Sequence, residues 1–429
     1  MMTTLHEFPF FPINFNKKGE VVAPTEVAEL LAHLSATPVT DLLVLSHGWN
    51  NDTDEAHALY DGLLGFLRRF APVGRTFAVL GVQWPSKKFA DSDLIPGGAA
   101  SGASQVADAE LLAQLELLRG AFDANGADAA LDEAKSLVPL LEDKQTARTR
   151  FADLLKSVLA GVETATTQDI DGLEHVQGAP SSSLVEKLGQ PDLLTTAPAA
   201  AEGTPALGHV AGLGDIFSDI KAGARNLLNF TTYYQMKERA GLVGSTGLRG
   251  VLASIKQVHP ALKLHLVGHS FGGRLVTAAI SGQDQFEAAS LSLLQAAFSH
   301  YGFSDSYDDS HKPGFFRPLL TSRRVTGPVL ATHTAADFAV GRMYPLASRL
   351  AGQVAADLGG PTDTYGGIGR NGAQKTPEAT TGTLLRVPGT YAFAPGRIHN
   401  LNADGIIGNH SDISREEVAA AIMQAVATT

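Results

Sequence analysis

The segment Leu262–Thr277, with the sequence LKLHLVGHSFGGRLVT, constrains the fold more than any other part of the chain. An apolar run ends at Val267, the sequence GHSFGG follows, and apolar residues at helical spacing come next. A strand, Gly-x-Ser-x-Gly and a helix in this order form the pattern of a nucleophile elbow. Glycines stand two positions before and after the serine because side chains there would collide with the incoming helix. The pattern predicts Ser270 as a nucleophile at a strand end; a Gly-rich turn with a buried structural serine is the alternative.

Composition excludes several classes of site and partner. The chain has 429 residues, 44% hydrophobic and 18% charged, which is enough for a large core and about two or three domains. The 33 Lys and Arg residues against 44 Asp and Glu give a net charge of −11. This charge argues against a nucleic-acid partner, because phosphate binding needs a basic surface. The chain has no cysteine, which excludes disulfides, a cysteine nucleophile and thiolate metal sites.

The sequence predicts neither a secretion signal nor a membrane span. The first twenty residues, MMTTLHEFPFFPINFNKKGE, lack a basic start followed by an apolar core and a small-residue cleavage site. No uncharged apolar stretch of about 18 residues occurs along the chain. We expect a cytoplasmic protein, although a secreted protein whose signal had been removed would have the same sequence. The oligomeric state is not indicated.

Apolar runs and helical spacings alternate on both sides of a long interruption. This alternation predicts an α/β fold with a doubly wound, mostly parallel sheet. The predicted buried strands are 41–46, 76–82, 262–267, 289–298, 329–334 and 390–395. Loops are predicted over 359–382 and 396–413, and a closing helix that Ser414 caps.

The interruption consists of helical spacings and loops. We expect a core formed by residues 1–89 and 240–429, and a helical insertion over 90–239. Residues 178–208 are rich in Ala, Pro, Ser, Thr and Gly, which is typical of a mobile loop. Ligands of such sheets bind at the carboxyl ends of the strands, so we expect the insertion to cap that edge. A helical domain packed elsewhere is the alternative.

A serine hydroxyl becomes a nucleophile when a base takes its proton, and that base is usually a histidine oriented by a carboxylate. Asp337 lies three residues beyond the predicted strand that ends at Thr334, where a strand meets its loop. The rival carboxylates lie in a polar loop and are better explained as solvated charges: Asp305, Asp308 and Asp309.

His410 is the predicted base. It lies in the sequence GNHSD, in a loop after the last predicted strand and shortly before the closing helix. His399 is the rival, but it lies closer to that strand. Three other histidines come too early in the chain: His300, His311 and His333.

With these residues, the chain resembles the α/β-hydrolase superfamily over roughly residues 40–90 and 240–425. The resemblance rests on HGWNN after a strand, then WPS, then GHSFGG. These motifs are similar to those of a little-characterised branch of bacterial intracellular hydrolases. The resemblance implies a sheet of α/β-hydrolase type and an esterase- or lipase-like enzyme. In it, Ser270 is the nucleophile, His410 the base and Asp337 the orienting acid.

The resemblance also implies an oxyanion hole. One N–H comes from Phe271, directly behind the nucleophile, and the second comes from the loop after the strand 41–46. We assign the second to Trp49, with Gly48 leaving room; an ordinary loop with a packed tryptophan is the alternative. Gly48 and His269 are expected to contact the substrate.

The expected reaction is the cleavage of a small-molecule carboxylic ester through an acyl-enzyme, without a metal or an organic cofactor. A helical cap would favour esters with apolar groups. The same three residues could serve a serine peptidase, an amidase or an acyltransferase. A binding protein with an idle triad is the alternative from a different class.

Overall fold

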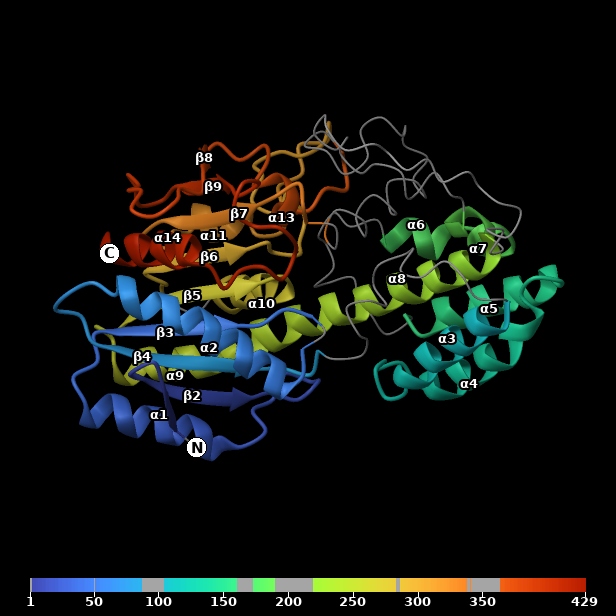
Figure 1. Cartoon of the computed structure of the whole chain (residues 1–429), viewed down its shortest axis with the longest axis horizontal. Helices are drawn as coiled ribbons and strands as arrows, with labels where there is room; N and C mark the ends of the chain where they lie inside the picture. Colours follow the sequence, from blue (N-terminus) through green and yellow to red (C-terminus); the bar gives the residue numbers. More distant parts are fainter. Residues whose placement is uncertain are drawn as a thin grey trace, which may run out of the picture.

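A nine-stranded sheet forms the centre of the computed structural model (Figure 1). The structure describes residues 2–49, 51–86, 104–159, 173–189, 219–282, 286–337, 340 and 363–429. The strand order is β1-β2-β4-β3-β5-β6-β7-β9-β8, and every neighbouring pair is parallel except β1 and β2. The strands are β1 (Thr3–Leu5), β2 (Phe8–Asn14), β3 (Asp41–Ser46), β4 (Phe77–Gln83), β5 (Lys263–His269), β6 (Ser290–Leu294), β7 (Val329–His333), β8 (Ala379–Thr383) and β9 (Ile398–Asn402). The prediction of an α/β fold with a mostly parallel sheet is confirmed.

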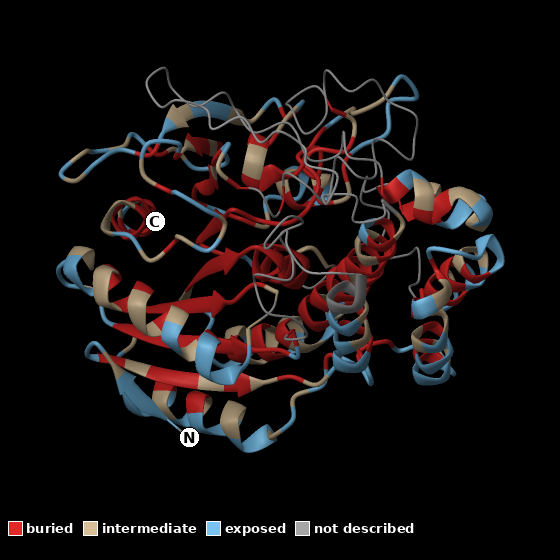
Figure 2. Ribbon diagram, turned by 45° about the vertical axis from the view of Figure 1, so that its right-hand side comes forward, coloured by how far each residue is buried: buried red, intermediate tan, exposed pale blue. Residues whose placement is uncertain are grey.

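Helices cover both faces of this sheet because its central strands are apolar on both sides. Leu42 and Val44 of β3 belong to one core cluster, and Leu43 and Leu45 belong to the other. The first cluster includes residues of α1 (Pro24–Ala36), α9 (Arg249–Val258) and α10 (Phe271–Ile280). The second includes residues of α2 (Thr53–Phe70) and α14 (Glu416–Ala427). Figure 2 shows the resulting buried sheet between helices whose outer faces are exposed.

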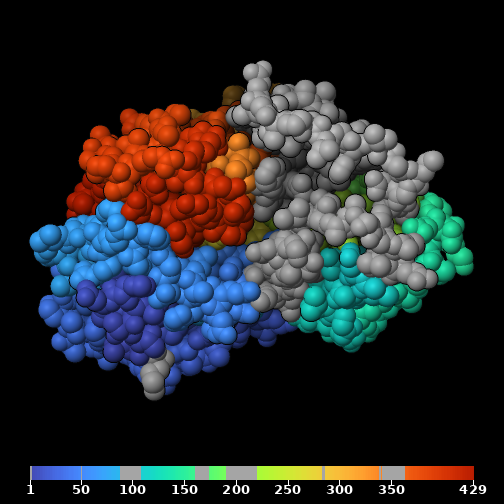
Figure 3. Space-filling model, in the orientation of Figure 1, coloured from blue at the N-terminus to red at the C-terminus, as the bar shows by residue number. Residues whose placement is uncertain are grey.

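The described part of the insertion is helical. Its elements are α3 (Ser104–Leu117), α4 (Ala127–Leu137), the 3₁₀ turn η2 (Val138–Leu140), α5 (Gln145–Ser157), α6 (Leu173–Gly178), α7 (Ser181–Gly189) and α8 (Asp219–Leu242). In Figure 1 the arrow of β2 points toward these helices, and Figure 3 shows them beside the atoms of the sheet-bearing part. The insertion therefore lies on the side of the carboxyl ends of the strands.

The predicted boundary at residue 239 falls inside a helix. α8 runs through residue 239 without a break and continues through a π-helical turn, Val243–Leu248 (η4), into α9. Side chains along α8 are buried in the same cluster as both the insertion helices and α10. One long helix thus connects the insertion to the sheet.

The prediction of a mobile loop over 178–208 is wrong for Ser181–Gly189, which forms α7. Leu184, Val185 and Leu188 of this helix are buried beside α5 and α8. This apolar face stabilises a helix within a segment whose overall composition is typical of a loop. Residues 190–208 lie outside the described residues.

The predictions near the end of the chain were partly wrong. Residues 390–395 are not a strand, whereas β9 and all but the last residue of β8 lie in the two segments predicted as loops. β8 has the sequence ATTGT and is mostly exposed at the sheet edge, so it lacks the apolar pattern of a buried strand. The N-cap of α14 is Arg415 rather than Ser414, with no side-chain cap hydrogen bond. The acidic Glu416 and Glu417 in its first turn favour this helix start through the helix dipole.

A cluster of buried polar side chains joins the amino ends of three strands. His265 of β5 donates from Nε2 to Asp41 Oδ1 of β3 at 2.8 Å and accepts at Nδ1 from the Ser290 hydroxyl of β6 at 2.8 Å. Arg75 lies 3.4 Å from Asp41 Oδ2. Burial raises the pKa of Asp41, but the hydrogen bonds from His265 and Thr40 outweigh it and lower the pKa. Asp41 therefore holds its charge inside the protein because its partners compensate the loss of water.

We predict that Asp41→Asn lowers the free energy of unfolding at pH 7 by about 3 kcal/mol, because it leaves His265 and Arg75 without their buried partner. Urea unfolding followed by circular dichroism measures the change, with the exposed Asp305→Asn as the control. A depressed carboxyl pKa stabilises the fold above its unfolded value and loses that effect as the pH falls through its folded value. The two stabilities should therefore converge below pH 3.8, the ordinary value for this group. Equal stability at pH 7 would contradict the prediction.

Candidate active site

Ser270 lies on a strained turn between β5 and α10. Its φ of 55° and ψ of −125° are unusual for a residue with a side chain. Three backbone hydrogen bonds of 3.0 Å hold the turn: its N–H donates to Leu294 O, and its carbonyl accepts from Gly273 N and Ala297 N. The end of β6 and the start of α10 together impose this conformation, as the elbow pattern predicts.

Glycines allow the backbone segments around Ser270 to meet. A Cβ atom at Gly268 would lie 2.4 Å from Gly272 O, and one at Gly272 would lie 2.2 Å from Ser46 O. A Cβ atom at Gly48 would lie 2.7 Å from Ser270 Cβ. Real Cβ atoms do not come this close to other atoms, so the turn, β3 and the loop after β3 can pack in this way only around glycine.

Asp337 and His410 meet at the carboxyl edge of the sheet. His410 Nδ1 donates to Asp337 Oδ2 at 2.9 Å, while Asp337 Oδ1 accepts from Val340 N at 2.9 Å. Asp337 follows β7 and is fully buried; His410 lies in the loop between β9 and α14 and has a partly exposed side chain. Because the carboxylate holds the proton on Nδ1, Nε2 of His410 is the nitrogen that can act as a base.

The rival residues lie in other surroundings. His399 lies within β9, where Nδ1 is 3.2 Å from Thr380 Oγ1 and Nε2 accepts from Ala394 N at 3.1 Å. Asp308 accepts hydrogen bonds from Ser310 and Lys312 of its own loop. Among the described contacts, it is Asp337 that pairs with His410.

His410 is held against the residue that precedes Ser270. His269 Nε2 donates to the backbone oxygen of His410 at 2.8 Å, and the two rings are 4.9 Å apart between centroids. His269 is buried, and burial lowers its pKa to about 3. The loop after β9 is thus tied to the elbow through a neutral histidine.

Asp404 is a residue at this site that the sequence analysis did not single out. Its Oδ1 accepts from Thr334 Oγ1 at 2.9 Å and from Ala335 N at 2.7 Å, which joins the loop after β9 to the loop that carries Asp337. Burial raises the pKa of Asp404, but these hydrogen bonds lower it overall. An aspartate two residues beyond a strand end was the signal in the sequence, but β9 itself was not predicted.

A buried network fixes the loop after β3, which carries the predicted second oxyanion group. The Tyr60 hydroxyl accepts from His47 N at 2.9 Å and donates to Val82 O at 2.5 Å. Trp84 Nε1 donates to His47 O at 3.0 Å, and its ring stacks on the imidazole of His47 at 5.6 Å. Burial lowers the pKa of His47 to about 4, so its ring is neutral near pH 7. The loop is thus supported on both sides before it reaches Gly48.

Three aromatic rings from separate elements gather beside the elbow. Tyr233 of α8 lies 4.9 Å from the ring of Phe271 and 6.3 Å from that of Trp49, and the latter two rings are 6.1 Å apart. Phe271 is the first residue of α10, so its N–H has no acceptor within the helix. Ser270 is 5% exposed. Because Tyr233 belongs to α8 and packs against Phe271, the insertion contacts the residue next to Ser270.

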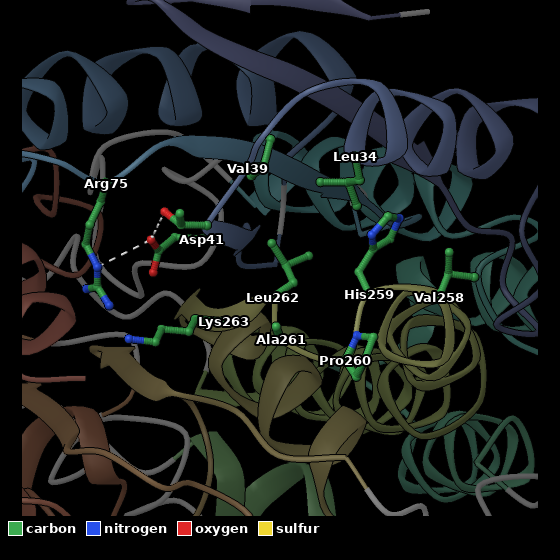
Figure 4. Close-up of a pocket in the computed structure, with 11 residues that line it drawn as sticks. Leu34, Val39, Asp41, Arg75, Val258, His259, Pro260, Ala261, Leu262 and Lys263 are labelled. Carbon is green, nitrogen blue, oxygen red and sulfur yellow. Dashed lines mark hydrogen bonds and ion pairs between the residues drawn. The ribbon is translucent and has the colours of Figure 1, made fainter.

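Two sizeable cavities have linings that do not include the predicted catalytic residues. One of about 590 Å³ lies at the amino ends of β3 and β5, where Leu34, Val39 and Leu262 face it (Figure 4). Lys263, which lines this cavity, is the first residue of β5 and lies seven residues before Ser270. An extended chain of that length places the two residues about 23 Å apart, at opposite ends of the strand. Another of about 570 Å³ lies at the ends of β2 and β4 and includes Asn51 and Arg239. Neither has Ser270, Asp337 or His410 in its lining.

Comparisons with known proteins identified no relative. No protein-family model, curated protein or solved structure matches the chain. In the part of the chain that the structure describes, no three or more His, Asp and Glu side chains are grouped so that they could hold a metal ion. Within the same residues, every helix is too short or too polar to cross a bilayer.

We predict that Gly268→Ala lowers the free energy of unfolding by about 3 kcal/mol, because the new methyl group meets the backbone of Gly272, which cannot move without displacing α10. The control is Gly250→Ala in α9, where a Cβ atom meets nothing within 4 Å. That change should stabilise the protein by about 0.5–1 kcal/mol, as alanine does in a helix. Urea unfolding of both variants is the measurement, and a Gly268→Ala variant as stable as the parent would refute the packing argument.

Proposed function

We propose that this protein is a serine hydrolase of α/β-hydrolase type that cleaves carboxylic esters through an acyl-enzyme. The observation that carries the proposal is the strained turn at Ser270 together with the 2.9 Å pair of His410 and Asp337 at the same sheet edge. A residue is held in such a backbone conformation only when its surroundings impose it, and such strain is concentrated at functional sites.

The arrangement of the strands supports the α/β-hydrolase type. Ser270 follows β5, Asp337 follows β7 and His410 follows β9, which is the order of nucleophile, acid and base in that superfamily. The three strands are parallel and lie close together in the sheet, so their carboxyl ends bring the following loops to one edge. The buried Asp337 suits the role of an orienting acid, because its second oxygen is held by Val340 N.

In the proposed reaction, Ser270 Oγ attacks the ester carbonyl carbon while His410 Nε2 takes the hydroxyl proton. Asp337 stabilises the imidazolium that forms. When the carbon–oxygen bond of the ester breaks, His410 gives this proton to the departing alcohol. A water molecule then attacks the acyl carbon, His410 takes a proton from it, and the acid leaves as Ser270 regains its hydrogen.

The proposed oxyanion hole consists of two backbone N–H groups. That of Phe271 begins α10, where the helix dipole also favours negative charge. That of Trp49 follows Gly48, which packs against Ser270. The network of His47, Tyr60 and Trp84 supports this loop before the substrate arrives, so little reorganisation is needed when the oxyanion forms.

We further propose that the insertion acts as a cap that favours apolar esters. Tyr233 of α8, Trp49 and Phe271 offer an aromatic wall beside the nucleophile. Aromatic walls of this kind stabilise acyl or alcohol groups by burying their carbon surface.

We predict that Ser270→Ala lowers the turnover of p-nitrophenyl esters on the order of a millionfold and abolishes labelling by a fluorophosphonate. The fold should remain, as judged by thermal unfolding. Ser281→Ala, at the other end of α10, is the matched control and should keep parental activity. More than about a tenth of the parental activity in Ser270→Ala would exclude this residue as the nucleophile.

The same assay separates the acid and base from their rivals. Asp337→Asn and His410→Ala should each cost about 10⁴-fold or more, and combining either with Ser270→Ala should add little, because the three residues act as a unit. Asp305→Asn and His399→Ala should retain activity. Peptide substrates tested beside the esters distinguish an esterase from a peptidase.

We predict that Tyr233→Ala lowers kcat/KM for long-chain p-nitrophenyl esters about tenfold, with a much smaller effect on the acetate, because the aromatic wall contributes about 1–2 kcal/mol of apolar contact. Tyr391→Ala, which removes a tyrosine stacked on Phe393 far along the chain from α8, is the control. An equal loss for short and long esters would show that Tyr233 does not select the acyl chain.

A further inference from the structure

We infer that His269 is a positioning residue: its side chain fixes the backbone of the loop that carries His410 to the strand that carries the nucleophile. The inference rests on the proposed function, in which His410 is the base. It assigns His269 a different role from the substrate contact that the sequence analysis expects.

The hydrogen bond between the two histidines has only one possible direction. A backbone carbonyl can only accept, so the 2.8 Å contact of His269 Nε2 with His410 O requires the proton on Nε2. The other tautomer would place the Nε2 lone pair against the carbonyl oxygen. The contact therefore fixes both the tautomer and the position of the ring.

The surroundings of the second ring nitrogen, Nδ1, indicate that packing alone does not explain a histidine at position 269. Nδ1 is buried and has no hydrogen-bond partner among the described residues. A Cβ atom at Gly48 would lie 3.1 Å from it, so this nitrogen faces the backbone after β3. Burying an acceptor without a hydrogen bond destabilises a protein. An apolar side chain would avoid this cost, so the bond that Nε2 makes is the property that distinguishes histidine here.

The neutral state of His269 matters for the base beside it. Burial and the nearby His410 and His47 lower the pKa of His269 to about 3, so the ring carries no charge near pH 7. A charged ring 4.9 Å from His410 would oppose the imidazolium that forms during acyl transfer. His269 is also too weak a base to take the Ser270 proton in place of His410.

The two supports of His410 act on different parts of the residue. Asp337 holds its side chain through Nδ1, while His269 holds its main chain through the carbonyl oxygen. His269 is also joined to Ser270 by a peptide bond. The proposed nucleophile and the proposed base are thus both attached to the end of β5, although they lie far apart in the chain. A base displaced by about 1 Å can cost a hundredfold in rate.

Two substitutions of similar size separate hydrogen bonding from packing. In His269→Gln the amide Nε2 is the same number of bonds from Cβ as the imidazole Nε2, so it can donate to the same carbonyl. In His269→Leu the volume is largely kept and the donor is lost. His399→Leu is the matched control, because it removes another contact of a histidine ring with a backbone group, 3.1 Å to Ala394 N, away from the elbow.

The test combines ester kinetics with hydrogen–deuterium exchange on the full chain. We expect His269→Leu to lower kcat for p-nitrophenyl esters about tenfold or more, with KM changed less than about twofold. Backbone amides of residues 404–413 should exchange faster in this variant. His269→Gln should recover most of kcat and the parental exchange, and His399→Leu should match the parent in both measurements.

Three results would overturn the inference: parental kcat and exchange in His269→Leu, equal impairment of the Gln and Leu variants, or a raised KM with unchanged kcat. The last result would indicate that His269 contacts the substrate. If the parent neither hydrolyses esters nor reacts at Ser270 with a fluorophosphonate, the proposed function fails. The exchange measurement then decides on its own whether His269 holds the loop.

Discussion

The close approach of three backbone segments around Ser270 is the constraint on which the rest of the site depends. The end of β5, the start of α10 and the loop after β3 meet at distances that no Cβ atom would tolerate. This packing imposes the positive φ of Ser270, because the turn has no room to relax. It also brings the first N–H of α10 and the loop of Gly48 to the same point. The strained turn, the proposed nucleophile and the proposed oxyanion donors are consequences of a single arrangement.

Polar contacts between loops then assemble the rest of the site around this point. Asp404 joins the loop after β9 to the turn of Asp337, and His269 joins the same loop to the elbow. His410 therefore stands between two fixed positions on different strands. Forming these contacts costs the loops little conformational entropy, because each loop begins at the end of a strand in a rigid parallel sheet. The amino ends of the strands have a comparable network of buried side chains, formed by Asp41, His265 and Ser290.

The insertion is connected to this site through one helix. α8 carries apolar residues that pack in the insertion and, further along, Tyr233, which touches the rings beside the elbow. α8 continues through a π-helical turn into α9, so one continuous helical segment runs from the insertion to the core around the sheet. π-helical turns within helices are often found at functional sites. The aromatic wall therefore contains residues from both parts of the chain: Tyr233 from the insertion, and Trp49 and Phe271 from the sheet-bearing part.

The sequence by itself determined the parts of this protein that follow from local rules. The apolar runs predicted the central strands, and β3 begins and ends at the predicted residues, because a strand buried on both faces is apolar along most of its length. The glycine spacing predicted the turn at Ser270, because the collision that Gly268 avoids is with Gly272, only four residues along the chain. Only the tertiary structure decided what depends on distant neighbours. The edge strand β8 is polar and gains its conformation from pairing with β9, and α7 gains its own from packing against α5 and α8. The hydrogen bond between His269 and His410 is of the same kind, since the two residues are distant in the chain and only the sheet brings them together.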